Sequence, residues 1–369
     1  MRSPSEMVTI QIELTSACPL KCSNCTRFCG THEKPFFLEE DQFRAAVDSL
    51  VEYSKMPHAM VGFMGGDPCL HPKFEEYCEY ALSKIDRMKL GLWTTFPPAK
   101  KHLRTAIAKT FGNILLNDHS RDDILHAPVL MAAEDYFRKP CPRCEGRGDT
   151  SPKQDPEGPQ FDCEWSPCPG CGGKGTVTDD LNLFAAVEHC WIQESWSAAI
   201  NPKGAWFCEV AAALSDLFDG PEGWKVEPGW WKRTPMSFRE QMEWACKKCG
   251  AALPLERIRN SQDPRDDVSS SNLERLKAIK SRKVKRGEVA LREEFKFDPS
   301  LHGKTYPNQT YKDMMYRQNI AAKYDMYLTI NERGYWEPHL KEDGGFVEPK
   351  APDNHPPSLF KIFQETYTQ

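Results

Sequence analysis

The sequence predicts an α/β fold built on a parallel sheet, followed by smaller cysteine-rich units. Strand-like and helix-like patterns alternate from residue 8 to residue 117, 15 cysteines gather in close sets, and residues 190–249 hold seven of the ten tryptophans. Short strand-helix repeats imply parallel strands joined by right-handed crossovers, with helices outside the sheet. A chain of 369 residues is long enough for about two domains of roughly 150 residues each.

The alternation is clearest in the first third of the chain. Residues 8–17 alternate apolar and polar side chains and lead directly into Cys18, which predicts a strand followed by a cysteine loop. The patterns that follow predict a helix at 38–53, a strand at 58–66, a helix at 72–85, a strand at 89–96, a helix at 99–111 and a strand at 112–117. In such folds the functional site lies at the carboxyl ends of the strands.

Composition divides the rest of the chain. A stretch rich in Gly, Pro and Cys without apolar periodicity reads as an insertion, and an apolar run at 181–187 reads as one more strand. The expected units are a sheet domain at 1–139, an insertion at 140–177, the last sheet strand at 178–189, a compact unit at 190–255, a charged linker or helix at 256–300 and an aromatic extension at 301–369.

Charge and targeting signals point to the cytoplasm. The net charge is -5, so the whole chain has no electrostatic drive toward nucleic acid or an anionic membrane. The first ten residues lack the apolar core of a secretory signal, and no run approaches the roughly 18 apolar residues of a membrane helix. Since disulfides are rare in a reducing compartment, closely spaced cysteines indicate metal ligands.

The first cysteine set is Cys18, Cys22 and Cys25, a C-x3-C-x2-C run directly after the first predicted strand. Three thiolates can hold three irons of a cubane 4Fe-4S cluster and leave the fourth iron without a protein ligand. The alternative is an incomplete zinc knuckle, with Cys29 as a spare ligand.

The second predicted strand ends in Gly65, Gly66, Asp67 and Pro68. Two glycines at the carboxyl end of a strand allow an amino-acid group to approach the backbone closely.

Together these motifs resemble the radical S-adenosylmethionine (radical SAM) superfamily over about residues 8–187. The resemblance implies a partial (β/α)6 TIM-like barrel and a 4Fe-4S cluster on the three cysteines, whose fourth iron is chelated by SAM. A reducing electron then cleaves SAM to a 5′-deoxyadenosyl radical that abstracts a substrate hydrogen. The implied SAM contacts are Gly65, Gly66, Asp67 and Pro68, with Thr94, Thr95 and Asn117 as further strand-end candidates.

The sequence departs from the family pattern at two positions. Asn24 stands where an aromatic residue usually precedes the third cysteine, and Asp67 stands where Glu is common. Both departures bear on the contacts to SAM and not on the cluster ligands.

The second cysteine set consists of two C-x2-C-x-G-x-G knuckles 23 residues apart, formed by Cys141, Cys144, Cys168 and Cys171. Four sulfurs in a tetrahedron are typical of structural zinc, and the glycines allow tight turns around thiolates. The pair resembles half of the zinc module of the DnaJ chaperone family, which implies one Zn²⁺ but no chaperone function. A second iron-sulfur cluster is the alternative.

The third set is Cys190, Cys208, Cys246 and Cys249. Residues 201–204, Asn-Pro-Lys-Gly, predict a hairpin turn that brings the first two of these cysteines together. This arrangement resembles the Twitch and SPASM extensions of radical SAM proteins, which bind auxiliary 4Fe-4S clusters, and four ligands match the single cluster of Twitch. A zinc ribbon made by the same cysteines is the alternative.

A run of seven basic residues lies at 275–286, which can bind phosphates or form a solvated face.

From the three cysteine sets and the resemblance, we expect a cytoplasmic radical SAM enzyme with two 4Fe-4S clusters and one zinc, served by an electron donor such as flavodoxin or ferredoxin. The expected substrate is a small metabolite or a nucleoside or DNA base. Nucleic acid is therefore a possible partner, and no membrane partner is expected. The alternatives are a peptide-modifying radical SAM maturase, disfavoured because the first strand starts at residue 8, and a non-catalytic zinc-stabilised binding protein.

Overall fold

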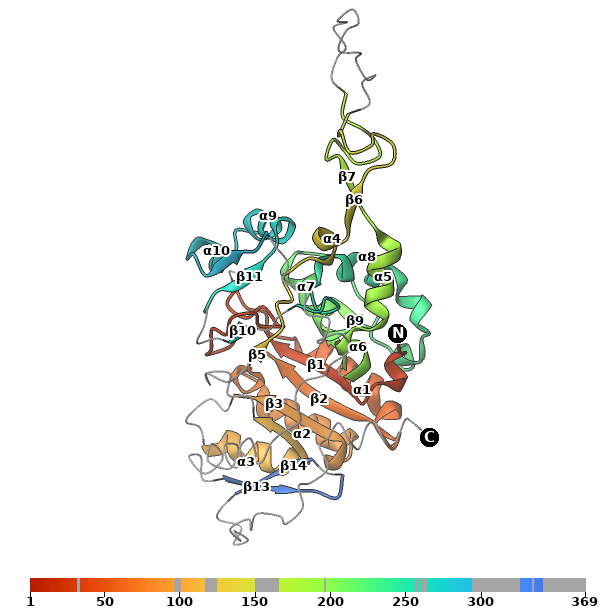
Figure 1. Ribbon diagram of the computed structural model, residues 1–369. Helices are drawn as coiled ribbons and strands as arrows, with labels where there is room; N and C mark the ends of the chain where they lie inside the picture. Colours follow the sequence, from red (N-terminus) through yellow and green to blue (C-terminus); the bar gives the residue numbers. More distant parts are fainter. Residues whose placement is uncertain are drawn as a thin grey trace, which may run out of the picture.

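The centre of the protein is a six-stranded sheet with strand order β4-β3-β2-β1-β8-β9 (Figure 1). The computed structural model describes residues 1–31, 34–95, 101–116, 125–149, 166–195, 197–255, 258–259, 264–293, 326–333 and 335–340. The sheet strands are β1 (Thr9–Thr15), β2 (Met60–Gly65), β3 (Leu90–Thr94), β4 (Asn113–Leu116), β8 (Ser197–Asn201) and β9 (Gly204–Trp206). The first five run parallel, and β9 returns antiparallel to β8.

Three helices connect the first four strands, namely α1 (Glu40–Ser54), α2 (Phe74–Lys84) and α3 (Lys101–Thr110). The alternation in β1 places Ile10 and Ile12 in the main hydrophobic core with the helix residues Phe43 and Val47, all with no exposed surface. The parallel sheet and the elements predicted between residues 8 and 117 are confirmed. Closure into a barrel remains a prediction.

One predicted strand is wrong. Residues 181–187 lie in a helix, α5 (Asp180–Glu188), whose buried residues are Leu183 and Val187. These two positions are one helical turn apart, while Leu181 is 82% exposed, so the buried side follows helical and not strand periodicity. A short apolar run alone does not distinguish a strand from a helix, and the Leu and Ala of this run are good helix formers.

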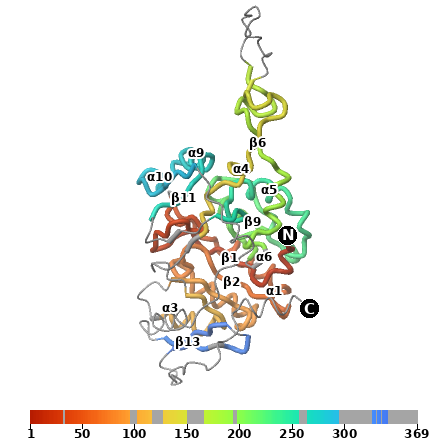
Figure 2. Tube along the Cα trace, in the orientation of Figure 1, coloured from red at the N-terminus to blue at the C-terminus, as the bar shows by residue number. Residues whose placement is uncertain are grey.

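The cysteine-rich insertion projects from the body on a two-stranded stalk (Figures 1 and 2). The stalk pairs β6 (Arg138–Pro140) antiparallel to β7 (Thr176–Thr178), and α4 (Ala133–Tyr136) lies at its base. The two C-x2-C knuckles therefore lie at a distance from the parallel sheet.

The chain after the stalk returns to the body. It forms α6 (Trp191–Ser195), α7 (Glu209–Leu217) and α8 (Arg239–Ala245). The short β10 (Ile258–Arg259) pairs antiparallel with β5 (Leu125–His126), which lies before the stalk in the sequence. A hairpin of β13 (Met326–Ile330) and β14 (Trp336–Leu340) lies beside α3 and β4. Residues 264–293 form a small unit of β11 (Asp266–Val268), α9 (Ser270–Ala278), α10 (Arg282–Lys285) and β12 (Val289–Leu291). We call it the β11–β12 unit, and Figure 1 shows it beside the N-terminal cysteine loop.

Within the described residues, no helix combines the length and the apolar character needed to cross a bilayer.

Candidate metal centres

The first cysteine set gathers on the loop after β1. Burial raises the pKa of the Cys22 thiol, and the neighbouring Cys25 and Cys18 add to the shift. Cys29 joins this set, because thiol hydrogen bonds with Cys18 and Cys25 raise its pKa, with burial adding to them. The structure thus brings the three predicted ligands together with Cys29, the spare ligand of the zinc-knuckle alternative.

The two glycines at the end of β2 are required by the backbone that leads into Cys18. The Gly66 amide donates to the Thr15 carbonyl at 2.6 Å, and the Asp67 amide donates to the Ala17 carbonyl at 2.7 Å. A Cβ added at Gly66 would lie 2.1 Å from the Ala17 oxygen, which is closer than any real contact. Close packing of the two strand ends therefore accounts for the glycines without a ligand.

Asp67 is buried and holds the end of β3. Its carboxylate accepts from the Thr94 hydroxyl at 3.0 and 3.1 Å, and from the Thr95 amide and hydroxyl at 3.1 and 2.6 Å. It also accepts from the Cys69 amide at 3.1 Å. Asp67 and Thr94, both predicted SAM contacts, thus bind each other. Pro68 lies buried in the next turn, and Asn117 lies outside the described residues.

The β11–β12 unit docks on the first cysteine loop, a contact that the sequence analysis missed. The Asn24 amide donates to Asp266 Oδ1 at 2.6 Å, and the Lys283 ammonium donates to the Cys22 carbonyl at 3.2 Å. Asn24 has a left-handed φ of 52°, which Asn tolerates better than most residues. Residues 256–300 were expected to form a charged linker or helix. Within this segment, residues 264–293 form the β11–β12 unit, which packs against the loop. Asn24, one of the two departures from the radical SAM motif, was the one sign of this contact in the sequence.

The second cysteine set forms a compact four-sulfur group at the tip of the stalk. The Sγ atoms of Cys141 and Cys168 are 4.0 Å apart, and those of Cys144 and Cys171 are 3.7 Å apart. All four sulfurs lie within 4.8 Å of one another. Thiolates around a tetrahedral zinc at 2.3 Å would be about 3.8 Å apart, so the donor set fits one zinc-sized ion.

Backbone amides support these sulfurs symmetrically. Gly148 donates to the sulfur of Cys144 at 3.3 Å, and Gly175 donates to that of Cys171 at 3.2 Å. The pKa of Cys144 is lowered to about 7, since this amide and the other cysteines of the set outweigh the opposing effect of burial. Burial raises the pKa of Cys171 to about 11, the other cysteines of the set add to the rise, and the Gly175 amide opposes it. The knuckle glycines therefore allow turns that direct backbone amides at the sulfurs, as their spacing predicted.

The third set is also assembled. Cys190 precedes α6, Cys208 precedes α7, and Cys246 and Cys249 flank one turn after α8. Burial raises the pKa of the Cys246 thiol, and its three partners add to the shift. The predicted hairpin is confirmed by the Asn201–Gly204 pairing of β8 with β9. Among the described residues, only the stalk set has three or more ligand atoms all within 4.8 Å, so these sulfurs are spaced more widely than around one ion.

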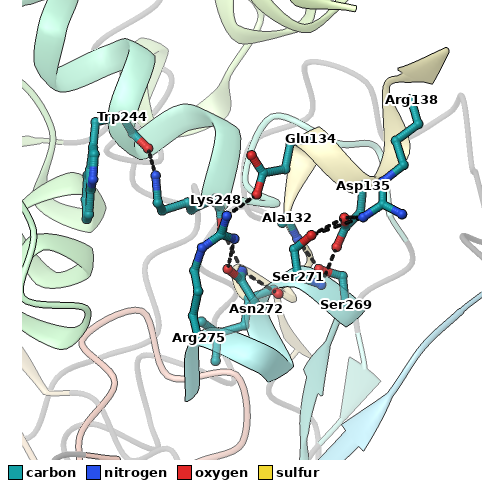
Figure 3. Close-up of polar contacts among 11 residues, drawn as sticks. Ala132, Glu134, Asp135, Arg138, Trp244, Lys248, Ser269, Ser271, Asn272 and Arg275 are labelled. Atoms are coloured by element: carbon teal, nitrogen blue, oxygen red, sulfur yellow. Dashed lines mark hydrogen bonds and ion pairs between the residues drawn. The ribbon is translucent and has the colours of Figure 1, made fainter. Parts of the chain in front are cut away.

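The β11–β12 unit also contacts the base of the stalk and Lys248, in the turn between two cysteines of the third set (Figure 3). The Asn272 amide donates to the carbonyls of Leu130 and Lys248 at 2.8 Å each, and Lys248 lies between Cys246 and Cys249. Further along the same interface, Arg275 pairs with Glu134, and Ser271 and Arg138 bind Asp135. One small unit therefore contacts both the first and the third cysteine set.

A buried ion pair joins the two sets more directly. Arg27, two residues after Cys25, places Nη2 at 2.8 Å from the Glu209 carboxylate and at 2.6 Å from Gln11 Oε1. Its Nε lies 3.5 Å from the carboxylate of Glu13. Arg27, Glu13 and Glu209 were not identified from the sequence, because the polar positions of an alternating strand are expected to face solvent, whereas every residue of β1 is buried.

No protein-family model and no curated protein matches the sequence. Among solved structures, BtrN in complex with AdoMet and 2-DOIA is similar at 13% identity over 66% of this chain and 92% of that chain, with a TM-score of 0.38. BtrN in an open conformation is similar at 11% identity over 66% of this chain and 86% of that chain, with a TM-score of 0.36.

SuiB from Streptococcus suis bound to S-adenosylmethionine is similar at 18% identity over 29% of this chain and 23% of that chain, with a TM-score of 0.24.

Proposed function

We propose that this protein is a radical SAM enzyme that holds a 4Fe-4S cluster on Cys18, Cys22 and Cys25. The observation that carries the proposal is the position of this C-x3-C-x2-C loop, which follows β1 at the carboxyl edge of a parallel sheet and packs against the glycine end of β2. When bound, the cluster and SAM would supply a 5′-deoxyadenosyl radical for hydrogen abstraction. The protein's own part is to hold the loop, exclude water and orient the substrate.

The donor chemistry fits an iron-sulfur cluster. The thiols of the first set are partly or fully buried at the carboxyl edge of the sheet, and a cubane spreads its thiolates over separate irons. Replacing Cys29 tests whether the fourth iron of the cluster lacks a protein ligand. If the fourth iron is reserved for SAM, Cys29→Ser retains the cluster and SAM cleavage, whereas loss of both would favour a four-cysteine site.

The third set is proposed to hold an auxiliary 4Fe-4S cluster in a Twitch-like domain at 190–255. Its support is the wider spacing of four mutually interacting cysteines next to the main core. Its role would be to relay an electron from the substrate radical or to bind substrate. The stalk set is proposed to hold Zn²⁺, supported by the 3.7 and 4.0 Å sulfur distances.

The proposed substrate is a small metabolite or a nucleoside or DNA base, with a flavodoxin or ferredoxin as electron donor. The basic side chains of Lys277, Lys280, Lys285 and Arg286 are exposed on and around α9 and α10, which favours the nucleic-acid-linked class. One alternative is a peptide-modifying maturase. The other is a non-catalytic zinc-stabilised binding protein, which would need only the four-sulfur site of the stalk.

Anaerobic reconstitution followed by metal analysis tests the proposal. Two cubane clusters and one zinc give about eight irons and one zinc per chain. Replacing Cys18, Cys22 and Cys25 with Ala should remove about four irons and leave the zinc. Replacing Cys141 and Cys144 is the matched control, which should remove the zinc and leave the iron. A reconstituted protein that holds zinc but no iron would support the binding-protein alternative.

A further inference from the structure

One lysine of the basic run at 275–286 is buried. Lys283 is 4% exposed, whereas Lys285, two residues further along α10, is exposed. A lysine is rarely this buried unless its charge is paired, so its surroundings are informative.

The partner of Lys283 is Asp266, at the start of β11. The ammonium donates to the two carboxylate oxygens at 2.9 and 2.8 Å, and Asp266 is 1% exposed. The same ammonium donates to the Cys22 carbonyl, and the same carboxylate accepts the Asn24 amide. Two opposite charges, both shielded from water, therefore touch the backbone of the first cysteine loop.

The short distances place both charges directly against the cysteine loop. Because Lys283 and Asp266 are both almost entirely buried, water screens their charges less than it screens charges on the surface.

We infer that Lys283 and Asp266 are positioning residues that set the reduction potential of the cluster on Cys18, Cys22 and Cys25. This inference rests on the proposed function. Reduction adds one negative charge to the cluster, so a nearby positive charge favours the reduced form and a nearby negative charge opposes it. Net charge and hydrogen bonding around a cluster are among the main determinants of its potential.

Removing one charge leaves the other uncompensated, so the two single variants shift the potential in opposite directions. Lys283→Met leaves the Asp266 carboxylate alone and lowers the midpoint potential. Asp266→Asn leaves the ammonium alone and raises it. The double variant has no net change of charge and returns toward the wild-type value.

The experiment is a potentiometric titration of the reconstituted full-length protein, followed by electron paramagnetic resonance. The first cluster is identified as the signal that Cys18→Ala, Cys22→Ala and Cys25→Ala together abolish. Lys285→Met is the matched control, because it removes an exposed charge from the same helix and should leave the potential unchanged. Lys283→Arg keeps the charge and should stay close to wild type.

Opposite shifts in the two single variants support the inference. Equal potentials in all variants would overturn it, and so would loss of the first cluster from both single variants, which would indicate a purely structural role. Failure of the proposed function looks different, because then the wild type itself would lack the signal that the cysteine replacements abolish.

Discussion

The guanidinium of Arg27 lies 2.8 Å from the carboxylate of Glu209, and this ion pair is almost entirely buried. Arg27 follows Cys25 by two residues and Glu209 follows Cys208 directly, so the pair ties the first cysteine set to the third. Breaking one partner of a buried pair leaves an uncompensated charge and costs about 3–5 kcal/mol. Glu209→Gln should therefore loosen both sets, visible as faster loss of iron from each cluster on dilution into chelator.

The third member of this group, Glu13, predicts a pH dependence. Burial raises its pKa to about 8, and Arg27 only partly opposes the shift. In an unfolded chain a glutamate titrates near about 4.3, so between these values the folded protein holds a proton that the unfolded chain has released. The free energy of unfolding should then fall as pH rises through this window, by up to about 1.4 kcal/mol per pH unit from this group.

Glu13→Gln removes this contribution. Relative to wild type, the variant should gain stability steadily between about pH 6 and pH 8, measured by urea unfolding. The matched control is Glu52→Gln, whose carboxyl is exposed and paired with Lys55, and which should show no such gain. A constant difference between Glu13→Gln and wild type across that range would contradict the role of Glu13.

Asn24 is expected to be needed for docking of the β11–β12 unit. Its side chain and Asp267 exchange two hydrogen bonds, each of 2.9 Å. Since hydrogen bonds to charged groups contribute about 1.5–3 kcal/mol, Asn24→Ala should lower the free energy of unfolding by about 2–3 kcal/mol. Asn24→Gly avoids the left-handed strain and should be less destabilised, by about 1 kcal/mol. Equal thermal midpoints for wild type and Asn24→Ala would refute the docking role.

Gly66→Ala should disrupt the approach of the chain to Cys18. The added Cβ would meet the Ala17 carbonyl, which is backbone and cannot move without displacing the loop. Gly30→Ala is the control in the same loop, because nothing lies within 4 Å of its added Cβ and only the left-handed backbone cost of about 1–2 kcal/mol applies. Iron bound at the first set should fall in Gly66→Ala and persist in Gly30→Ala. Full iron retention in both would show that the loop tolerates the displacement.

The stalk is expected to depend on its metal. Among the described residues of its tip, the apolar cluster consists of the four cysteines and Val177, so metal ligation is expected to take the place of a hydrophobic core there. Cys168→Ser should abolish zinc binding and make the stalk the first site of proteolysis, while the iron content stays unchanged. Cys78→Ser, in α2, lies outside all three sets and should keep the zinc. Zinc retained at full occupancy in Cys168→Ser would argue against a four-thiolate site.

Local patterns in the sequence predicted the parallel sheet and the cysteine sets, because strand period and ligand spacing are local properties. The residues that hold these sets could not be predicted in the same way. Asn24 and Asp266 are 242 residues apart, and no local signal pairs them. The role of Asp67 could not be predicted either. Its position after β2 suggested a contact with SAM, whereas its carboxylate accepts hydrogen bonds from Thr94 and Thr95 at the end of β3. The helix at 181–187 was missed because short apolar runs fit either period.

The central claim is SAM cleavage at the first cysteine set, and the most direct measurement is reductant-dependent formation of 5′-deoxyadenosine. We expect the reconstituted protein to form it from SAM, and the variant lacking Cys18, Cys22 and Cys25 to form none while it retains iron at the third set. No 5′-deoxyadenosine from fully reconstituted wild-type protein, or equal amounts from the triple variant, would contradict the account.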